Sequence, residues 1–145
     1  MKIRMVEIKD LKYLSELYVS VFSLPPWNEY WEYSWAEERL AWIFNSQGFM
    51  GYLATINDEI IGTILGNLVP FKGTKRFKIL DFFVSYKYQK QGIGSQLICK
   101  LESELKTNSY NFVTLLTAKN SKAETFYLHK DYQINEKLEL LYKEL

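Results

Sequence analysis

The sequence predicts an α/β fold: a mixed, mostly antiparallel central sheet flanked by helices, built as a single domain over residues 1–145. Two observations lead to this prediction. Segments with apolar residues at helical spacing alternate with short strand-like runs, and three such runs follow one another in the middle of the chain. Consecutive strands form antiparallel hairpins, whereas helical crossovers near the end of the chain place strands in parallel, so the sheet is mixed.

Composition narrows the class of protein before any motif is considered. The chain is 48% hydrophobic and 24% charged, which is typical of a globular protein, and its net charge is +1. This balance favours neither nucleic acid nor an anionic membrane as a partner. The N-terminus lacks the apolar core of a signal peptide, and no apolar run approaches the roughly 18 residues of a membrane span. We therefore expect a cytoplasmic protein without a nucleic-acid or membrane partner and without a bound metal.

The first third of the chain predicts one strand and two helices. Residues 2–8 alternate weakly and predict a strand, after which Asp10 can cap a helix that ends before Pro25-Pro26. Ser34 and Glu37 have the spacing of a capping box, so a second helix is expected to begin at Ser34. Its inner face would carry Ala36, Leu40, Ile43 and Phe44, and Gly48 would close it.

The rest of the chain predicts further strands and two more helices. The expected strands are residues 49–56, 60–69, 77–84 and 112–117, with a last strand or hairpin over 132–145. The expected helices are residues 92–105 and 121–130. We expect a turn at Asn57-Asp58 and a loop over 70–75. The helix over 92–105 contains the single cysteine, Cys99, which we expect to be a buried, inert thiol.

Two glycines stand where the strand 77–84 gives way to the following helix. Gly92 and Gly94 allow the backbone to turn sharply and to approach a ligand closely. A helix N-terminus adds unpaired backbone N–H groups and a partial positive charge, and together these features favour a phosphate or pyrophosphate. A dinucleotide fingerprint would need a third glycine where Leu97 stands, and no P-loop pattern is present. The alternative is a tight connection that holds no ligand.

The glycine segment resembles a motif of a known family. Gln89 to Gly94, QKQGIG, fits the pattern [Q/R]-x-x-G-x-[G/A] and looks like the acyl-coenzyme A binding motif of the GNAT superfamily of N-acetyltransferases. The stretch LDFFVSYKYQKQGIGSQL is similar to the small-molecule branch, which includes the diamine acetyltransferases. A second match is Asn120 before the last helix and the pair Phe126-Tyr127 within it, although Asp131 stands where a glycine is usual. The order β-α-α-β-β-β-α-β-α-β, with one further strand if the end forms a hairpin, resembles this family over nearly the whole chain.

The resemblance implies acetyl-CoA as co-substrate and assigns residues to it. The two middle strands of such enzymes splay apart, so Phe83 and Val84 would offer backbone groups to the pantetheine amides. Asn120 would hydrogen-bond the pantetheine arm, or would merely lead into the helix. The backbone N–H groups that would cradle the pyrophosphate belong to Gln89, Lys90, Gln91, Gly92, Ile93, Gly94 and Ser95.

The resemblance also suggests catalytic residues. Tyr127 would point its hydroxyl at the thioester sulfur, unless it is simply a core tyrosine, and the Val84 N–H would polarise the carbonyl. Asp81 is an acidic residue in an otherwise apolar strand, where a carboxylate is costly to bury without a partner. It could orient a cationic amine or accept its proton through water, or it could be a structural hydrogen-bond acceptor. The diamine acetyltransferases carry an acidic residue where Leu80 stands here, which argues against a polyamine acceptor.

The segment Ser23–Trp35 is the predicted acceptor side, because it interleaves aromatic rings with carboxylates. Such a wall suits a cationic amine, although it could also be an aromatic lid packed on the core. The residues expected to bind the acceptor are Trp27, Glu29, Tyr30 and Trp31, together with Asp81. We expect an acetyl-CoA-dependent N-acetyltransferase acting on a primary amine of a small, cationic molecule. The alternatives are a protein or peptide N-acetyltransferase and a non-catalytic acyl-CoA-binding sensor; small enzymes of this kind often form homodimers.

Overall fold

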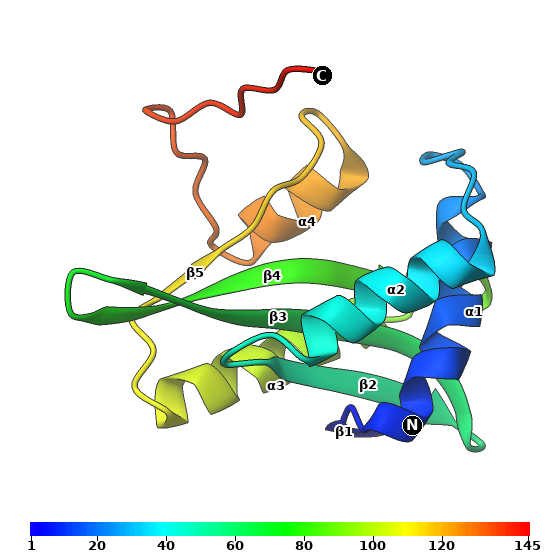
Figure 1. The fold of residues 1–145 in the computed structure, drawn as a ribbon. Helices are drawn as coiled ribbons and strands as arrows, with labels where there is room; N and C mark the ends of the chain where they lie inside the picture. The colour runs from blue at the N-terminus through cyan, green and yellow to red at the C-terminus, as the bar shows by residue number, and fades with distance from the viewer. The chain divides into compact units, whose positions relative to one another are not determined.

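The computed structural model describes all 145 residues, and the chain divides into two compact units, residues 1–115 and 116–145, which we describe separately. The first unit contains a five-stranded sheet with the strand order β1-β2-β3-β4-β5 (Figure 1). Neighbouring strands are antiparallel except for β4 and β5, which are parallel, so the α/β class and the mixed, mostly antiparallel sheet are confirmed. The strands are Lys2–Met5, Met50–Ile56, Glu59–Phe71, Thr74–Val84 and Phe112–Thr114. The extent of the domain, residues 1–145, stays a prediction.

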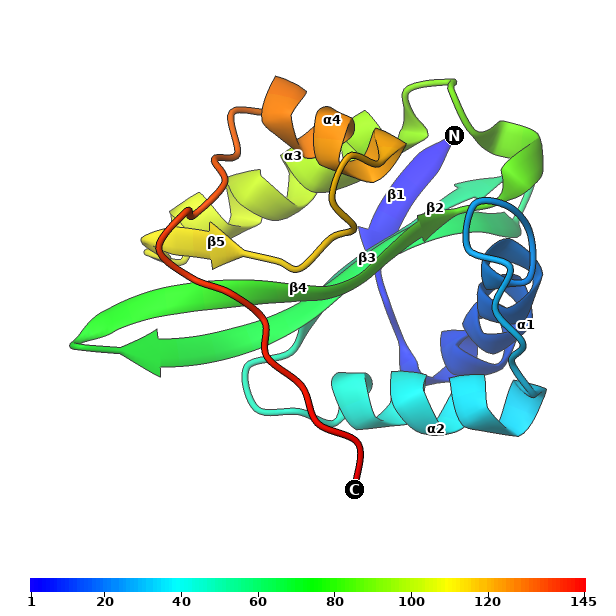
Figure 2. The same cartoon turned by 90° about the horizontal axis from the view of Figure 1, so that it is seen from above.

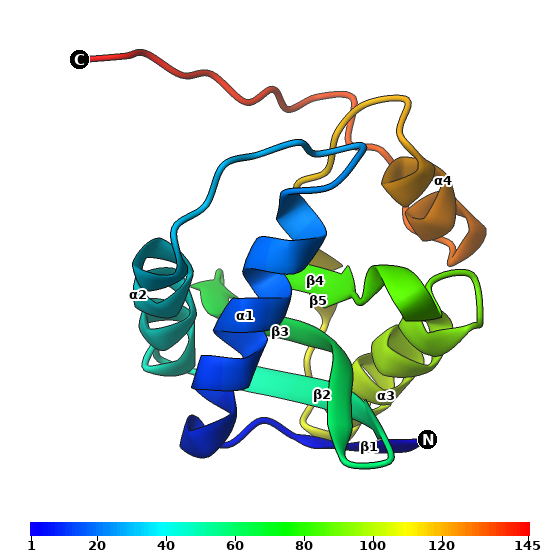
Figure 3. The ribbon, with the colours of Figure 1, turned by 90° about the vertical axis from the view of Figure 1, so that its right-hand side faces the viewer.

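Helices cover both faces of this sheet. Helices α1 (Leu11–Phe22) and α2 (Tyr33–Phe44) lie side by side on one face, and α3 (Ile93–Thr107) lies on the other (Figures 2 and 3). The core under α1 and α2 contains Leu14, Tyr18, Leu40, Ile43, Leu53, Leu65 and Phe83. Helix α3 buries Ile93, Leu97, Ile98, Leu101 and Leu105. Successive strand residues point to opposite faces, so one sheet supports both layers.

The starts of α1 and α2 differ from the sequence prediction. Asp10 does not cap α1; its carboxylate accepts from the Glu7 N–H at 2.8 Å and thereby closes the short 3₁₀ turn η1 (Ile8–Asp10). Helix α2 begins at Tyr33 instead of Ser34, because the Glu32 carbonyl already accepts the first helical hydrogen bonds and no side chain caps the helix. The inward-facing Ala36, Leu40 and Ile43 are buried as predicted.

The loop predicted over residues 70–75 is wrong. Strand β3 runs to Phe71 and β4 begins at Thr74, so only Lys72 and Gly73 form the connection. Both have positive φ, +48° and +74°, which matches the twist of the flanking strands in a two-residue hairpin. The predicted turn at Asn57-Asp58 has the same character, with φ of +49° and +65°.

Cys99 is exposed, contrary to the prediction of a buried thiol. Helix α3 buries Leu97, Ile98 and Leu101, and each residue turns about 100° from the previous one, so position 99 faces outward. None of the helices is long and apolar enough to cross a membrane. The cytoplasmic location and the homodimer stay predictions.

The second unit, residues 116–145, contains helix α4 (Lys122–His129). The predicted cap at Ser121 is confirmed, because its hydroxyl accepts from the Glu124 N–H at 3.1 Å. The predicted strand over residues 132–145 is wrong. Leu138, Leu140 and Tyr142 alternate as strand residues do, yet no strand pairs with them and all three are exposed. The predicted strand over 112–117 is shortened to β5, Phe112–Thr114.

Candidate active site

Strand β4 has a partly unpaired edge. Its residues Arg76–Lys78 pair with the three residues of β5, and beyond Lys78 no strand pairs with this edge up to Val84 (Figure 2). No strand therefore bonds to the backbone groups on this side, although the Val84 carbonyl already accepts from the Gln89 side chain. Phe83 and Val84, predicted to contact a pantetheine arm, lie in this stretch. The Ser85 N–H donates to the Ile61 carbonyl, so in the alternating antiparallel register the backbone groups of Phe83 face β3 and those of Val84 face the open edge.

A β-bulge lies where the pairing with β5 stops. Leu65 of β3 pairs with Asp81 of β4, but Gly66 pairs with Ile79, so Leu80 is an additional residue on β4. Bulges bend a strand and increase its twist, which gives the unpaired part of β4 its own direction.

The glycine segment forms a loop that ends at an uncapped helix N-terminus. The Gln89 side chain donates to the Val84 carbonyl at 3.0 Å, which folds the loop back on the end of β4. Gly92 precedes α3 with φ of +79°, and no side chain caps the helix. A Cβ added at Gly92 would meet nothing within 4 Å, so glycine is needed there for its φ and the space beside it is open.

This loop fits the pyrophosphate cradle predicted for it. The first N–H groups of an α-helix have no partner within the helix, and in α3 these belong to Ile93, Gly94 and Ser95. Lys90 and Gln91 are exposed on the preceding turn, and the Gln91 side chain donates to the Lys87 carbonyl at 3.4 Å. The assignment of coenzyme contacts to Gln89–Ser95 stays a prediction.

Asp81 forms a bidentate ion pair with Arg39 of α2. The Arg39 Nε donates to Oδ2 at 2.9 Å and Nη2 donates to Oδ1 at 3.1 Å. The Asp81 side chain is 6% exposed and that of Arg39 is 35% exposed. Burial raises the pKa of Asp81, and the hydrogen bonds and charge of Arg39 counteract this only in part. Of the roles predicted for Asp81, this geometry favours that of a structural hydrogen-bond acceptor, and the donor is the Arg39 side chain.

Tyr18 lies beside this ion pair and packs against two other aromatic rings. The Tyr18 ring meets those of Trp31 and Phe83 edge-on, with centroids 4.7 and 5.4 Å apart. Burial raises the pKa of Tyr18, and the negative charge of Asp81 adds to this effect. Burial lowers the pKa of Arg39, but the hydrogen bonds and charge of Asp81, with smaller contributions from Tyr18 and Glu29, outweigh it, so the pKa is raised overall. Trp31, Glu29 and Asp81 therefore belong to one neighbourhood.

The other two residues of the predicted acceptor side are more exposed. Trp27 packs against Phe22 with ring centroids 5.6 Å apart and keeps 38% of its surface exposed. Tyr30 is 76% exposed, and its ring lies edge-on to that of Trp35 at 5.7 Å. The segment thus combines one ring packed on the core with two rings open to solvent, and its predicted role as the acceptor side stays a prediction.

Tyr127 and Asn120 lie in the second unit. The Tyr127 ring contacts those of Phe126 and Tyr132 at centroid distances of 5.4 and 5.5 Å, and burial raises the pKa of Tyr127 to about 12. Asn120 has a φ of +57° and precedes the helix cap Ser121. The roles predicted for Tyr127 and Asn120 stay predictions.

Comparison with known proteins decides the family. Residues 11–132 match the family model described as the acetyltransferase (GNAT) family. The chain belongs to the GNAT acetyltransferase family. None of the curated proteins matches the chain.

Solved structures have the same fold at low sequence identity. A "possible acetyltransferase" from Clostridium difficile 630 aligns with a TM-score of 0.85 at 13% identity, covering 99% of this chain and 97% of its own. An aminoglycoside acetyltransferase from an uncultured soil metagenomic sample, solved in complex with sisomicin, aligns with a TM-score of 0.75 at 20% identity, covering 99% and 95%. A transcriptional regulator from Bacillus halodurans C-125 aligns with a TM-score of 0.75 at 20% identity, covering 99% of both chains. These likenesses show the fold alone.

Sequence reasoning missed two residues of this GNAT-family site, Arg39 and Tyr18. Arg39 lies three residues after the inward-facing Ala36, so it borders the buried face of α2. A lone arginine beside a buried helix face and a lone aspartate in an apolar strand are complementary, and that complementarity was the available signal.

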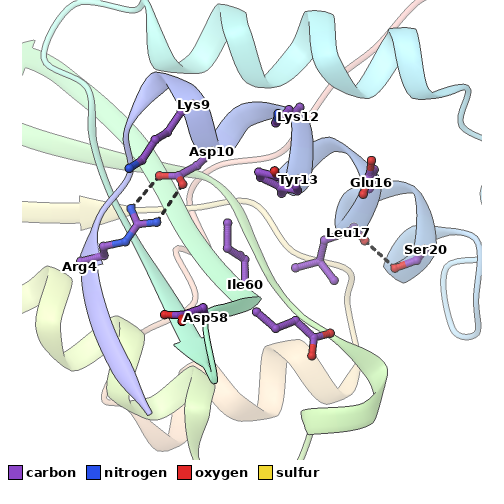
Figure 4. A pocket seen from close by; sticks show the side chains of 11 residues that line it. Arg4, Lys9, Asp10, Lys12, Tyr13, Glu16, Leu17, Ser20, Asp58 and Ile60 are labelled. Atoms are coloured by element: carbon purple, nitrogen blue, oxygen red, sulfur yellow. Dashed lines mark hydrogen bonds and ion pairs between the residues drawn. The ribbon is translucent and has the colours of Figure 1, made fainter.

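A separate hollow lies between α1 and the β2–β3 turn (Figure 4). Its walls carry charges of both signs, including Glu16, Asp58 and a second ion pair, Arg4–Asp10. None of the residues predicted to bind coenzyme or acceptor lines it. The Arg4–Asp10 pair in the wall of this hollow is a structural ion pair that can be compared with Arg39–Asp81.

Proposed function

We propose that this GNAT-family protein transfers an acetyl group from acetyl-CoA to a primary amine of a small molecule. One observation carries the proposal: β4, whose outer edge pairs with no strand beyond Lys78, is followed after the loop 85–91 by an uncapped helix N-terminus preceded by Gly92 at φ +79°. An extended arm suits a strand edge and a pyrophosphate suits a helix N-terminus, so the two features together suit acetyl-CoA. Family membership supports acetyl transfer as the reaction.

The transfer makes one bond and breaks one. The neutral amine nitrogen attacks the thioester carbonyl, the carbon–sulfur bond breaks, the nitrogen loses a proton, and the departing thiolate gains one. We assign the Val84 N–H to the carbonyl oxygen, where negative charge develops. We assign the Tyr127 hydroxyl to the thiolate. With its pKa raised to about 12, this hydroxyl stays protonated and able to donate throughout the neutral range.

The acceptor proposed is a cationic amine held by the segment around Trp27, Glu29 and Tyr30. These side chains are exposed and combine two aromatic rings with a carboxylate, which is a favourable surface for an ammonium group. The neighbour solved with sisomicin makes aminoglycosides a reasonable first choice. In this proposal Asp81 acts through Arg39, which donates hydrogen bonds to both oxygens of its carboxylate.

Thiol release from acetyl-CoA tests the function directly. Separate pools of aminoglycosides, polyamines, amino acids and short peptides would each be supplied as acceptor. Release with the aminoglycoside or polyamine pool supports the proposal, release with peptides alone supports a protein acetyltransferase, and binding without release from any pool supports a sensor.

Replacing Tyr127 with phenylalanine tests the proton donor. We expect kcat to fall about a hundredfold, because the thiolate loses its acid, while KM for acetyl-CoA stays close to that of the wild type. Tyr132→Phe is the matched control, since the Tyr132 ring contacts that of Tyr127 at 5.5 Å and has no assigned role. Full turnover by Tyr127→Phe at every pH would remove the hydroxyl from the mechanism.

A further inference from the structure

Arg39 contacts β4 at two successive residues. Besides the two bonds to the Asp81 carboxylate, its Nη2 donates to the Leu80 carbonyl at 3.3 Å. Leu80 is the additional residue of the β-bulge, which the β3–β4 register leaves without a partner. The guanidinium is planar and rigid, so it holds the bulged carbonyl and the Asp81 carboxylate in one fixed relation.

The backbone of Arg39 is itself well fixed. Ala36, Leu40 and Ile43 on the same helix are fully buried against the sheet. On the strand side, Asp81 is followed by the buried Phe83, whose ring contacts Tyr18. The guanidinium therefore links two rigid elements at the bulge, and movement of either element would change the bulge.

The bulge lies between two functionally different parts of β4. Before it, Arg76–Lys78 pair with β5; after it, β4 stays paired with β3 up to Val84, but no strand pairs with its other edge. The direction of this second part sets where the outward-facing backbone groups of Val84 point. The proposed acyl-pantetheine arm depends on those groups.

We propose that the Arg39–Asp81 pair is a positioning device for the acyl-pantetheine arm. It holds the Leu80 bulge so that the unpaired edge of β4 faces the arm, and Arg39 touches neither coenzyme nor acceptor. This inference rests on the proposed use of acetyl-CoA. It assigns to Asp81 a role through Arg39 in place of direct contact with the amine.

A double replacement separates positioning from stability. Arg39→Met with Asp81→Val exchanges the ion pair for apolar side chains, which buried ion pairs tolerate with little loss of stability. The variant and the wild type would be titrated with acetyl-CoA and with the phosphorylated ADP fragment of coenzyme A, which carries the pyrophosphate but no pantetheine arm. Urea unfolding would show that the variant is folded.

We expect affinity for acetyl-CoA to fall about tenfold, the equivalent of one or two backbone hydrogen bonds, while affinity for the ADP fragment stays within about twofold. Arg39→Lys provides a milder test in a folded protein. Its ammonium keeps the charge but lacks the planar fork that joins Asp81 to the Leu80 carbonyl, so we expect a smaller loss confined to acetyl-CoA.

The matched control is Arg4→Met with Asp10→Val, which removes the other bidentate Arg–Asp pair. It should leave both affinities unchanged. Wild-type affinity for acetyl-CoA in the folded Arg39 variants, or an equal loss in the control, would overturn the positioning role alone. A wild-type protein that binds neither ligand would instead overturn the proposed function, and this inference with it.

Discussion

The chain contains two bidentate Arg–Asp pairs with similar hydrogen-bond lengths, one made through Nη1 and Nη2 of Arg4 and the other through Nε and Nη2 of Arg39. Arg4 donates to Asp10 at 2.8 and 2.9 Å, and Arg39 donates to Asp81 at 2.9 and 3.1 Å. Both carboxylates are almost fully buried, with side chains 4% and 6% exposed. They differ in whether a backbone N–H also donates to the carboxylate. Asp10 also accepts from the Glu7 N–H, whereas Asp81 accepts from Arg39 alone.

As a result, the pKa values of the two carboxyl groups are shifted in opposite directions. Burial raises the pKa of Asp10, but hydrogen bonds from Arg4 and the Glu7 backbone outweigh it, so the pKa is lowered overall. Asp81 lies deeper, among more protein atoms, and its pKa is raised because Arg39 offsets only part of the burial. The comparison teaches that a backbone donor, together with the depth of burial, decides whether an arginine is enough to stabilise a buried anion.

Removing the arginine from each pair should have the largest effect. Arg39→Met leaves Asp81 buried without a counter-charge, and we expect it to lower the free energy of unfolding by about 3 kcal/mol or more. Arg4→Met should cost less, about 1 to 2 kcal/mol, because Asp10 keeps the Glu7 N–H and Arg4 is 40% exposed. Urea unfolding at neutral pH measures both. Equal costs would show that the Glu7 N–H does not distinguish the pairs.

A pair of glycines extends the comparison from structure to binding. Gly92 and Gly73 have φ of +79° and +74°, and an added Cβ meets nothing within 4 Å at either. Replacement of each by glutamate should cost a similar 1 to 2 kcal/mol, roughly, because the left-handed conformation is unfavourable for any other residue. Only Gly92→Glu should lower affinity for acetyl-CoA, by about a hundredfold, since it places an anion where the pyrophosphate is proposed to bind. Calorimetric titration checks this; intact binding by Gly92→Glu would contradict the cradle.

The pH dependence of stability should have opposite signs for the two aspartates. The pKa of Asp10 in the folded protein is below its ordinary value of 3.8, so its contribution is present above 3.8 and lost as the pH falls through the lowered pKa. The pKa of Asp81 is above 3.8, so its contribution is present below 3.8 and lost as the pH rises through the raised pKa.

Unfolding curves of Asp10→Asn and Asp81→Asn between about pH 3 and about pH 7 measure this difference. The stability that the wild type has over Asp10→Asn should grow as the pH rises, and the stability that it has over Asp81→Asn should shrink. If the stability difference from the wild type changed with pH in the same direction for both variants, the two carboxyl groups would share one environment.

The smallest effect is expected at a solvent-exposed ion pair. Lys100 and Glu104 are one turn apart on α3, with Nζ and Oε1 separated by 2.6 Å and side chains 42% and 33% exposed. Glu104→Gln should lower the free energy of unfolding less than any replacement above, and less at high salt than at low salt. A cost matching that of Arg4→Met would mean that burial is not what separates the ion pairs.

Several local features of the fold could be predicted from the sequence, although the predictions of the Asp10 cap and of the loop over 70–75 were wrong, and long-range pairings could not be predicted. The turn at Asn57-Asp58, the Ser121 cap and the junction at Gly92 depend on neighbouring residues, so their patterns were sufficient. The start of α2 was misplaced because Glu32 and Ser34 are both acceptable first residues. The strand expected over 132–145 failed because alternation becomes a strand only when another strand is available to pair.

The candidate site shows the same difference between local and long-range features. The glycine segment was visible as a motif, but the partner of Asp81 was not, because Arg39 lies 42 positions earlier and on a helix. Asp81 was correctly singled out as a buried carboxylate that needs a partner. Only the three-dimensional structure shows that an arginine of α2 supplies the positive charge that was expected from the acceptor.

The uncapped start of α3 and the unpaired edge of β4 present main-chain groups, and every amino acid carries the same main chain. Most substitutions along these two segments would leave the proposed recognition surface unaltered, provided that the bulge at Leu80 and the left-handed turn at Gly92 persist. Selection on such a surface acts on conformation at a few positions and leaves its side chains free to drift.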